Sequence, residues 1–267
     1  PDDATPALQQ LKGENLYLRA MMHFNLVRIF GRPYTQGNGE NPGVPVLSDE
    51  LSEEQSVSIA RSSVKDVYAK VISDLMTVKK SNSFASTEVC YALLSRVYLY
   101  KGDNEKAIDY ANRVIESGRY ALLSGSEFSG YNKMTPENNA ETIFGIRHTK
   151  VEDRGFSSIG SMYFSGDATG SGAAQGVSGW GELYASQKYM DFIRQNPEDT
   201  RLSFVTPYMI NGELQYNKRL TPNAPMYYIN KFSLQEGVIN LSSPVYIRLA
   251  EVYLNRAEAN AKLGNTA

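Results

Sequence analysis

The amino-acid sequence predicts a mostly α-helical protein in which short helices pack in pairs. Apolar residues recur at every third or fourth position, which is the period of one face of an α-helix. The stretch from Ser86 to Leu122 forms two such segments joined by a Gly-Asp turn. Glycines also follow several segments at positions suited to a left-handed C-cap, namely Gly31, Gly102, Gly118 and Gly264. We therefore expect helices over residues 7–30, 63–80, 87–101, 105–117, 182–195 and 243–263.

The helix pair after Ser86 fits the tetratricopeptide pattern when Gly102-Asp103 is placed at its turn. Large residues then occupy the packing positions, namely Tyr91, Leu94 and Tyr98. Small residues, Ser95 and Ala107, lie where the two helices cross closely. The preceding helix has an N-cap candidate in Ser62 or Ser63, with Asp66 in its first turn. The sequence thus predicts tetratricopeptide-like helix pairs with long irregular loop inserts.

The last predicted helix has one packed face, on which residues follow one another at spacings of three and four; they are Leu249, Val252, Tyr253, Arg256, Ala257 and Asn260, and Leu254 and Ala261 widen the buried stripe. Glu251 is spaced to pair with Arg248 or Arg256 on a neighbouring turn. We expect a structural ion pair there.

Long irregular stretches separate the helices. A chain of 267 residues can form one large domain or two small ones. We expect a single domain over 1–267, with a helical scaffold at 7–30, 63–117, 182–195 and 243–263 and loop inserts at 31–62, 123–181 and 196–242. The second insert contains a glycine-rich tract from Ser165 to Gly181. Such a tract is either a flexible linker or a ligand-binding loop, and the sequence leaves both open.

Composition excludes several functions. The formal net charge of −2 provides no basic surface for nucleic acid. Cys90 is the only cysteine, so disulfides and thiolate metal clusters are ruled out, and its apolar neighbours predict a buried, inert thiol. Apolar runs are far shorter than the roughly 20 residues that span a bilayer.

Catalytic motifs are lacking too. His23 and His148 have no partner at metal-binding spacing, and neither a hydrolase elbow nor a phosphate-binding loop occurs. A pair of carboxylates for glycoside hydrolysis stays open, because such pairs meet through the fold. We expect no catalytic residue, no metal ligand and no cofactor.

Aromatic residues are the best candidates for ligand contact. The chain has eighteen tyrosines but one tryptophan, Trp180, between Gly179 and Gly181. A large aromatic on such a loop either packs down as an anchor or stands up as a stacking platform. The predicted ligand-binding residues are Trp180, Tyr163, Tyr184, Tyr131 and Tyr228. Tyr227 and Tyr228 precede a segment that could equally be a short strand.

Five blocks in order resemble the SusD/RagB family: Gly13 to Pro33, Gly43 to Glu50, Arg61 to Leu75, the helix pair, and Ser242 to Gly264. The shorter blocks Asn138 to Ile146 and Asp199 to Arg201 also lie where this family places similar sequences. Asp199 and Arg201 are expected to form an ion pair that orders their loop.

The resemblance implies a surface lipoprotein of Bacteroidetes that captures nutrients, usually glycans. It implies no catalysis, a SusC-like TonB-dependent transporter as partner, and an outer-membrane location through an N-terminal lipid anchor. The chain begins at Pro1 and stops at Ala267, which suggests a fragment lacking its signal and anchor.

Two other functions remain open. A tetratricopeptide scaffold would bind a protein or peptide in its concave groove, although the long inserts favour a loop-built site. An enzyme ranks third, because the chain has plentiful carboxylates but no catalytic motif.

Overall fold

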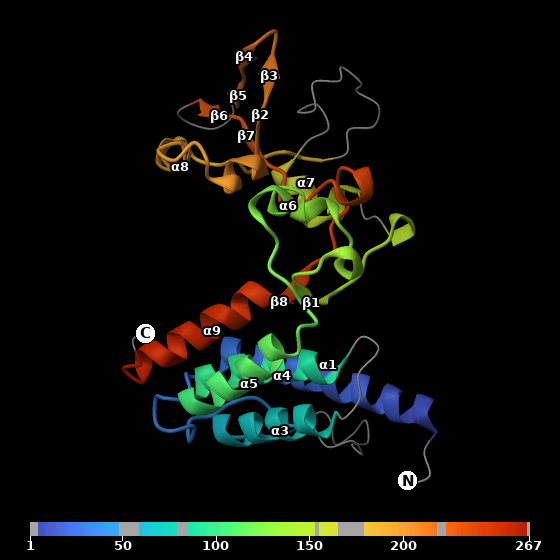
Figure 1. Cartoon of the computed structure of the whole chain (residues 1–267), viewed down its shortest axis with the longest axis vertical. Coiled ribbons are helices and arrows are strands. Elements are labelled where there is room, and N and C mark those ends of the chain that lie inside the picture. The colour runs from blue at the N-terminus through green and yellow to red at the C-terminus, as the bar shows by residue number, and fades with distance from the viewer. Residues whose placement is uncertain are drawn as a thin grey trace. The chain divides into compact units, whose positions relative to one another are not determined.

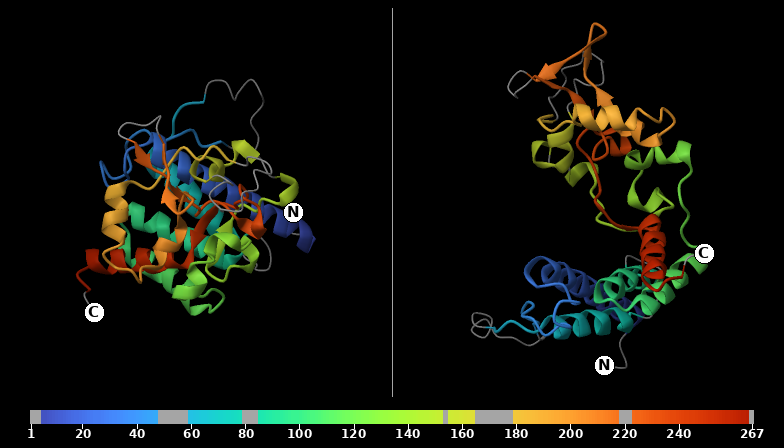
Figure 2. Two further views of the ribbon diagram at one scale, coloured as in Figure 1. Left: turned by 90° about the horizontal axis from the view of Figure 1, so that it is seen from above. Right: turned by 90° about the vertical axis from the view of Figure 1, so that its left-hand side faces the viewer.

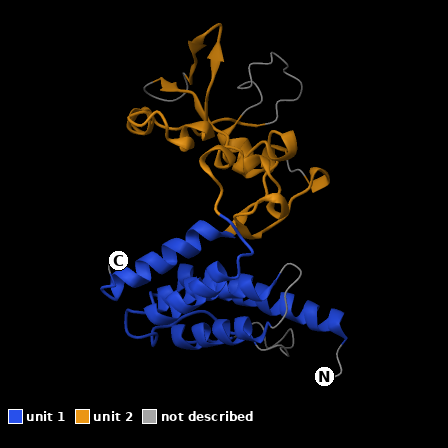
Figure 3. Cartoon of the chain, viewed as in Figure 1, with its two compact units in different colours: residues 1–121, 247–267 blue, residues 122–246 orange. Residues whose placement is uncertain are grey.

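The protein divides into two compact units (Figures 1 and 3). The computed structural model describes residues 5–47, 59–78, 85–152, 155–164, 179–217 and 223–265. Unit 1 comprises Pro1–Ala121 and Ile247–Ala267, and unit 2 comprises Leu122–Tyr246. The predicted mostly α-helical fold is confirmed, and the single-domain assignment remains a prediction. Residues 165–178 of the glycine-rich tract lie outside the described residues.

The described part of unit 1 consists of long helices, four of which begin at a side-chain N-cap. They are α1 (Pro6–Phe30), α3 (Val64–Thr77), α4 (Thr87–Lys101), α5 (Asn104–Glu116) and α9 (Leu249–Lys262). The side chains that accept a hydrogen bond from the first turns of α1, α3, α4 and α5 are Thr5, Ser63, Ser86 and Asp103. Ser63 is therefore the N-cap that the sequence predicted for α3.

The helices of unit 1 pack in chain order, α1 on α3, α3 on α4, α4 on α5, and α9 against α4 and α5 (Figure 2). The predicted helix pair is α4 and α5, and Gly102 between them has φ +85°. Ser95 and Ala107 are fully buried, as expected at a close helix crossing. Asn255 on α9 donates a hydrogen bond of 3.2 Å to the Ser95 hydroxyl.

The core of unit 1 is formed by side chains with almost no solvent exposure, chiefly Tyr17, Phe24, Val67, Val71, Leu75, Leu93, Leu94, Val97, Ala111 and Val252. Cys90 is buried among them, and burial raises the pKa of its thiol to about 12. The thiol is therefore protonated and unreactive, as the sequence predicted.

The structure gives Glu251 a partner that the sequence did not predict. Glu251 pairs with Arg96 on α4, through bonds of 2.5 Å from Arg96 Nε and 2.6 Å from Nη2. The Arg96 side chain is only 9% exposed, so its charge requires a partner that local spacing along α9 does not reveal.

Unit 2 is built from short elements. Its α-helices are α6 (Gly125–Phe128), α7 (Ile159–Tyr163) and α8 (Gln187–Ile193). Its 3₁₀ helices are η1 (Tyr131–Lys133), η2 (Pro136–Asn138), η3 (Lys150–Glu152), η4 (Gly155–Ser157), η6 (Thr200–Phe204) and η7 (Gln235–Gly237). Its strands are β1 (Thr142–Gly145), β2 (Val205–Pro207), β3 (Met209–Ile210), β4 (Glu213–Leu214), β5 (Tyr216–Asn217), β6 (Ala224–Pro225) and β7 (Tyr227–Ile229).

The strands of unit 2 pair two by two: β2 with β7, β3 with β4, and β5 with β6, all antiparallel. A two-residue turn of Asn211 and Gly212, both at positive φ, joins β3 to β4. One apolar cluster under α8 and β7 contains Ala185, Met190, Ile193 and Tyr227. The short strand that the sequence left open after Tyr228 lies mostly on the tyrosines themselves, because β7 covers Tyr227–Ile229 and ends before Asn230.

Two predicted helices start later than expected. Residues 182–186 are extended, and α8 begins only after Ser186, whose hydroxyl accepts from Tyr189 N. Strand β8 (Val245–Arg248), which pairs with β1, precedes α9, because Pro244 and three residues of high β-propensity favour extended backbone. Gly31 also differs from prediction, since its φ of −102° is extended and not left-handed.

Candidate functional site

The five predicted aromatic residues all lie in unit 2, and Trp180 lies on a segment that docks onto α7. Gly181 N donates to the Ser161 carbonyl oxygen at 2.8 Å, and the next two backbone N–H groups donate to the Met162 carbonyl oxygen. Gly181 has φ +54°, a conformation that favours glycine. The chain can therefore turn sharply beside the indole.

Trp180 stands at the surface. Its side chain is 57% exposed, and its ring meets the ring of Phe156 edge-to-face at 5.2 Å. The indole Nε1–H donates to the Phe156 carbonyl oxygen at 3.2 Å, which fixes the orientation of the ring. Of the two alternatives that the sequence left open, this geometry favours the platform, because an anchor would be buried.

A buried serine holds the groups that orient the indole. Ser161 is fully buried, and its hydroxyl donates to the same Phe156 carbonyl oxygen at 2.8 Å. On the other side of Trp180, a Cβ at Gly179 would lie 2.1 Å from the Phe164 carbonyl oxygen. Only glycine permits so close an approach, so the sequence feature Gly-Trp-Gly has a packing cause.

A second group of aromatic rings surrounds Tyr228, which is itself buried. The centroids of Tyr184, Tyr208 and Phe164 lie 5.5, 5.8 and 6.0 Å from that of Tyr228. Tyr184 and Tyr208 are half-buried and flank the buried ring. Tyr228 therefore supports its neighbours and has too little exposed surface to stack on a ligand.

An amide group lies beside these tyrosines. The Asn217 amide donates to the Tyr184 hydroxyl at 3.0 Å. Burial is the main cause that raises the pKa of Tyr184 above its usual value, so this hydroxyl is neutral and can act as donor and acceptor. Aromatic faces next to amide and hydroxyl groups are suited to polar ligands with apolar faces.

Of the five predicted residues, Tyr184 and Tyr228 are in direct ring contact, with centroids 5.5 Å apart. Tyr163 ends α7 and packs on Phe232 at 5.4 Å, directly before Phe164. Trp180, Tyr163, Tyr184 and Tyr228 are thus linked through α7 and the segment that docks on it. Tyr131 belongs to another cluster, in which it lies 6.0 Å from Phe128.

Sequence reasoning missed three residues of this region, namely Phe156, Ser161 and Asn217. Phe156 and Asn217 reach their partners across long separations in sequence, 24 residues to Trp180 and 33 residues to Tyr184. No local motif marks such contacts. The one available signal was the Gly155-Phe156-Ser157 triplet, an aromatic residue beside a glycine in a loop.

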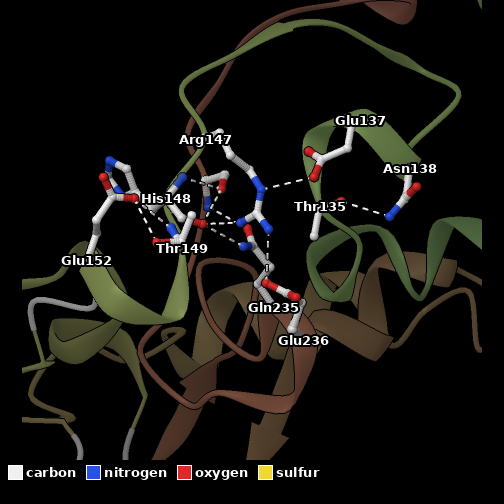
Figure 4. Close-up of polar contacts among 10 residues, drawn as sticks. Thr135, Glu137, Asn138, Arg147, His148, Thr149, Glu152, Gln235 and Glu236 are labelled. Carbon is white, nitrogen blue, oxygen red and sulfur yellow. Dashed lines mark hydrogen bonds and ion pairs between the residues drawn. The ribbon is translucent and has the colours of Figure 1, made fainter.

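A polar network centred on Arg147 stabilises a neighbouring loop (Figure 4). The guanidinium pairs with Glu137 at 3.0 Å and with Glu236 at 3.2 Å, and also donates to the His148 carbonyl oxygen. Gln235 donates to that oxygen at 3.1 Å and accepts from Ser243 N at 2.8 Å. The two carboxylates are thus neutralised by the Arg147 guanidinium, and the network has a structural role.

The loop held by this network is strained. Leu234 has φ +71° and Glu236 has φ +51°, values that cost free energy for residues other than glycine. The buried Gln235 side chain between them offsets that cost through its two hydrogen bonds.

Within the described ranges, no three His, Cys, Asp or Glu side chains gather as a metal site would require. The helices that are described include none with the length and apolar character needed to cross a bilayer.

The predicted Asp199–Arg201 ion pair is confirmed at 2.6 Å, and Asp199 also accepts from Arg201 N at the start of η6.

Comparison with known families agrees with this architecture. Residues 2–99 match the SusD-like family described as starch-binding and associating with the outer membrane, and residues 206–267 match the SusD family. The chain belongs to the SusD/RagB family. The resemblance noted in the sequence is thereby confirmed.

Solved structures extend the match to nearly the whole chain. A protein from Bacteroides vulgatus is 30% identical to this chain, with a TM-score of 0.75. The match covers 99% of this chain and 56% of the Bacteroides vulgatus protein. A SusD superfamily protein from Bacteroides thetaiotaomicron is 28% identical, with a TM-score of 0.74 and coverages of 98% and 57%. The chain therefore spans little more than half the length of these relatives. The comparison with curated proteins found no match.

Proposed function

We propose that this chain belongs to a non-catalytic cell-surface protein that binds an oligosaccharide and passes it to a SusC-like TonB-dependent transporter. A lipid anchor on a preceding segment would hold the protein at the outer membrane. Family membership supports the glycan class, and the first family description refers to starch and to the outer membrane. A laminarin-binding SusD-like protein shares the fold at 21% identity and a TM-score of 0.65.

The observation that carries the proposal is the exposed Trp180 platform. A sugar ring has an apolar C–H face that stacks on an aromatic plane, and its hydroxyls need adjacent donors and acceptors. Trp180 has an exposed ring of fixed orientation. In the same unit, Tyr184 and Tyr208 supply further rings, and the Asn217 amide lies beside the Tyr184 hydroxyl. The ligand-binding set that we propose is therefore Trp180 with Tyr163 and Tyr184, supported by Tyr228. Tyr131 stays a weaker candidate, because it lies in a separate cluster.

The first experiment measures binding of soluble neutral glycans, including laminarin and starch, by titration calorimetry and by tryptophan fluorescence. Trp180 is the only tryptophan, so its emission reports on this position alone. We expect Trp180→Ala to weaken binding by about 1 to 3 kcal/mol, by analogy with aromatic stacking on nucleobases. The melting temperature should hardly change, because the side chain is mostly exposed.

The matched control is Phe192→Ala, since Phe192 on α8 is an equally exposed aromatic residue, at 63%, outside the Trp180 segment. It should bind like the parent. An unchanged affinity of Trp180→Ala would remove Trp180 from the site, and a failure of every glycan to bind would refute the glycan class tested. New reducing ends after incubation with a bound glycan would show catalysis and overturn the non-catalytic assignment.

A further inference from the structure

The loop over residues 230–243, which follows β7, contacts the Trp180 segment through one buried residue, Asn240. This residue is only 3% exposed. Its side-chain Oδ1 lies 3.2 Å from the place that a Cβ on Gly179 would take, and its carbonyl oxygen lies 3.3 Å from the corresponding place on Gly160 of α7. The same residue therefore packs both on α7 and on the residue that precedes the indole.

The side-chain amide of Asn240 lacks a donor for its oxygen. Its Oδ1 is buried and accepts no hydrogen bond within the described part of the chain. A buried acceptor without a donor costs free energy, and an apolar side chain of similar size would avoid that cost. Buried polar groups are nearly always hydrogen-bonded, so this exception indicates a donor that the amide meets in another state of the protein.

The Trp180 segment has an unpaired donor at the same place. After the indole, the backbone N–H groups of residues 181–183 all donate to carbonyl oxygens of α7. Before the indole, Gly179 is also buried, but its N–H donates to no residue that the structure describes. Because the nitrogen and a Cβ share one Cα, the Gly179 nitrogen lies within about 6 Å of Asn240 Oδ1. A short movement of the segment would join this donor to that acceptor.

We propose that Asn240 is a positioning residue for the Trp180 platform, and that its amide oxygen accepts a hydrogen bond from Gly179 N–H when a glycan stacks on the indole. The ring is already oriented on one side, by the bond from its Nε1–H to the Phe156 carbonyl oxygen. The second bond holds the segment on the other side of the ring. A contact that forms only in the complex stabilises the complex relative to the free protein, so it increases affinity. This inference rests on the proposed function, because it concerns the same site.

The experiment compares Asn240→Ala with Ser233→Ala in the 267-residue chain. Ser233 is the matched control, because its buried hydroxyl is also unpaired and belongs to the same loop, but it lies against Gly160 instead of Gly179. Affinity for laminarin and for starch is measured by titration calorimetry, and exchange of the Gly179 amide proton by NMR. A second variant, Asn240→Leu, nearly keeps the volume of the side chain, so its melting temperature separates a packing defect from the loss of the amide.

We expect glycan binding to slow the exchange of the Gly179 amide proton in the parent but not in the two Asn240 variants. Both variants should bind about three- to tenfold more weakly, which is the effect of one hydrogen bond. Asn240→Leu should keep the melting temperature of the parent, because the amide oxygen accepts no hydrogen bond in the free protein. Ser233→Ala should bind like the parent.

Parent-like affinity of both Asn240 variants would overturn the inference. It would also be overturned by weaker binding that Ser233→Ala shares, by an affinity that falls only together with the melting temperature, or by a Gly179 amide proton whose exchange the bound glycan does not slow. A parent that binds neither glycan would refute the proposed function and this inference with it, so the two failures are distinguishable.

Discussion

The two units of this protein differ in how their residues are stabilised. The described residues of unit 1 form five helices of 13 to 25 residues, whose contacts lie between regular faces. Unit 2 has no helix longer than the seven residues of α8 among those described, and its chain is held by aromatic clusters and side-chain hydrogen bonds to backbone. Of the four non-glycine residues with positive φ in the described ranges, three lie in unit 2, and they are Asn211, Leu234 and Glu236.

This difference separates a scaffold from a binding surface. Regular helices satisfy their own backbone groups, so their side chains are free to pack. Irregular chain must satisfy its backbone through specific partners, as at Arg147 and Gln235, but it can present a ring such as Trp180 in an orientation that no helix face offers. Substitutions in unit 1 should therefore change stability, and substitutions near Trp180 should change binding.

The largest loss of stability is expected from Glu251→Ala in unit 1. This change removes the carboxylate that pairs with the buried Arg96 guanidinium, and breaking such a pair costs about 3 to 5 kcal/mol. Glu251 is 30% exposed on its side chain, so we expect a value near the lower limit. Urea denaturation measures the free energy of unfolding.

The matched control replaces both partners, as Arg96→Met with Glu251→Leu. The double variant should recover most of the lost stability, because no buried charge remains. A double variant as unstable as Glu251→Ala would show that packing, and not the charge, determines the effect.

The contact between Arg96 and Glu251 also shows what sequence reasoning can reach. The α4–α5 pair and some helix ends of unit 1 follow from local spacing and caps, as the structure confirms at Ser63 and Gly102, whereas Gly31 and the start of α9 differ from prediction. Arg96, the partner that the structure shows for Glu251, lies 155 residues away, and local spacing did not predict it. Pairing between distant segments requires the fold.

The same limit applies to the candidate site. Trp180 could be chosen from the sequence because it is the only tryptophan and lies between two glycines. This part of the prediction depends only on local chemistry. The burial of Tyr228 and the separate position of Tyr131 depend on strand β7 and on the Phe128 cluster, which no local pattern shows. Glycine and aromatic composition therefore indicates a site segment but not its full set of contacts.

A second test of the scaffold is Ala107→Leu in α5. Ala107 is fully buried against α4, so the added side chain should overpack the crossing and destabilise the protein by about 1 to 3 kcal/mol. Ala257→Leu, at an exposed position of α9, serves as control and should leave the melting temperature nearly unchanged. A melting temperature of Ala107→Leu within a degree of the parent would show that this crossing is not close.

Gly179→Ala tests whether unit 2 binds through a precisely placed indole. The new methyl group would lie 2.1 Å from the Phe164 carbonyl oxygen, so the segment must move and carry Trp180 with it. We expect glycan affinity to fall several-fold and the tryptophan emission to shift, with a smaller loss of stability than in Ala107→Leu. Gly237→Ala is the matched control at a glycine with nothing close to its Cβ, although its φ of +77° imposes a backbone cost. Emission and affinity identical to the parent in Gly179→Ala would show that the segment does not depend on this contact.

The smallest effect is expected at Asp199, whose ion pair orders one exposed turn of unit 2. Hydrogen bonds from the Arg201 side chain and backbone lower the pKa of Asp199 from 3.8 to about 2. A carboxylate with a lowered folded-state pKa contributes stability above its unfolded pKa, and this contribution is lost as the pH falls toward the folded value. The difference in melting temperature between the parent and Asp199→Asn should therefore be constant above about pH 5 and should shrink between pH 4 and pH 2. In an Arg201→Leu background the same comparison should depend less on pH, because the guanidinium that lowers the pKa is gone. A difference that persists unchanged at pH 2 would show that the Asp199 charge does not stabilise this turn.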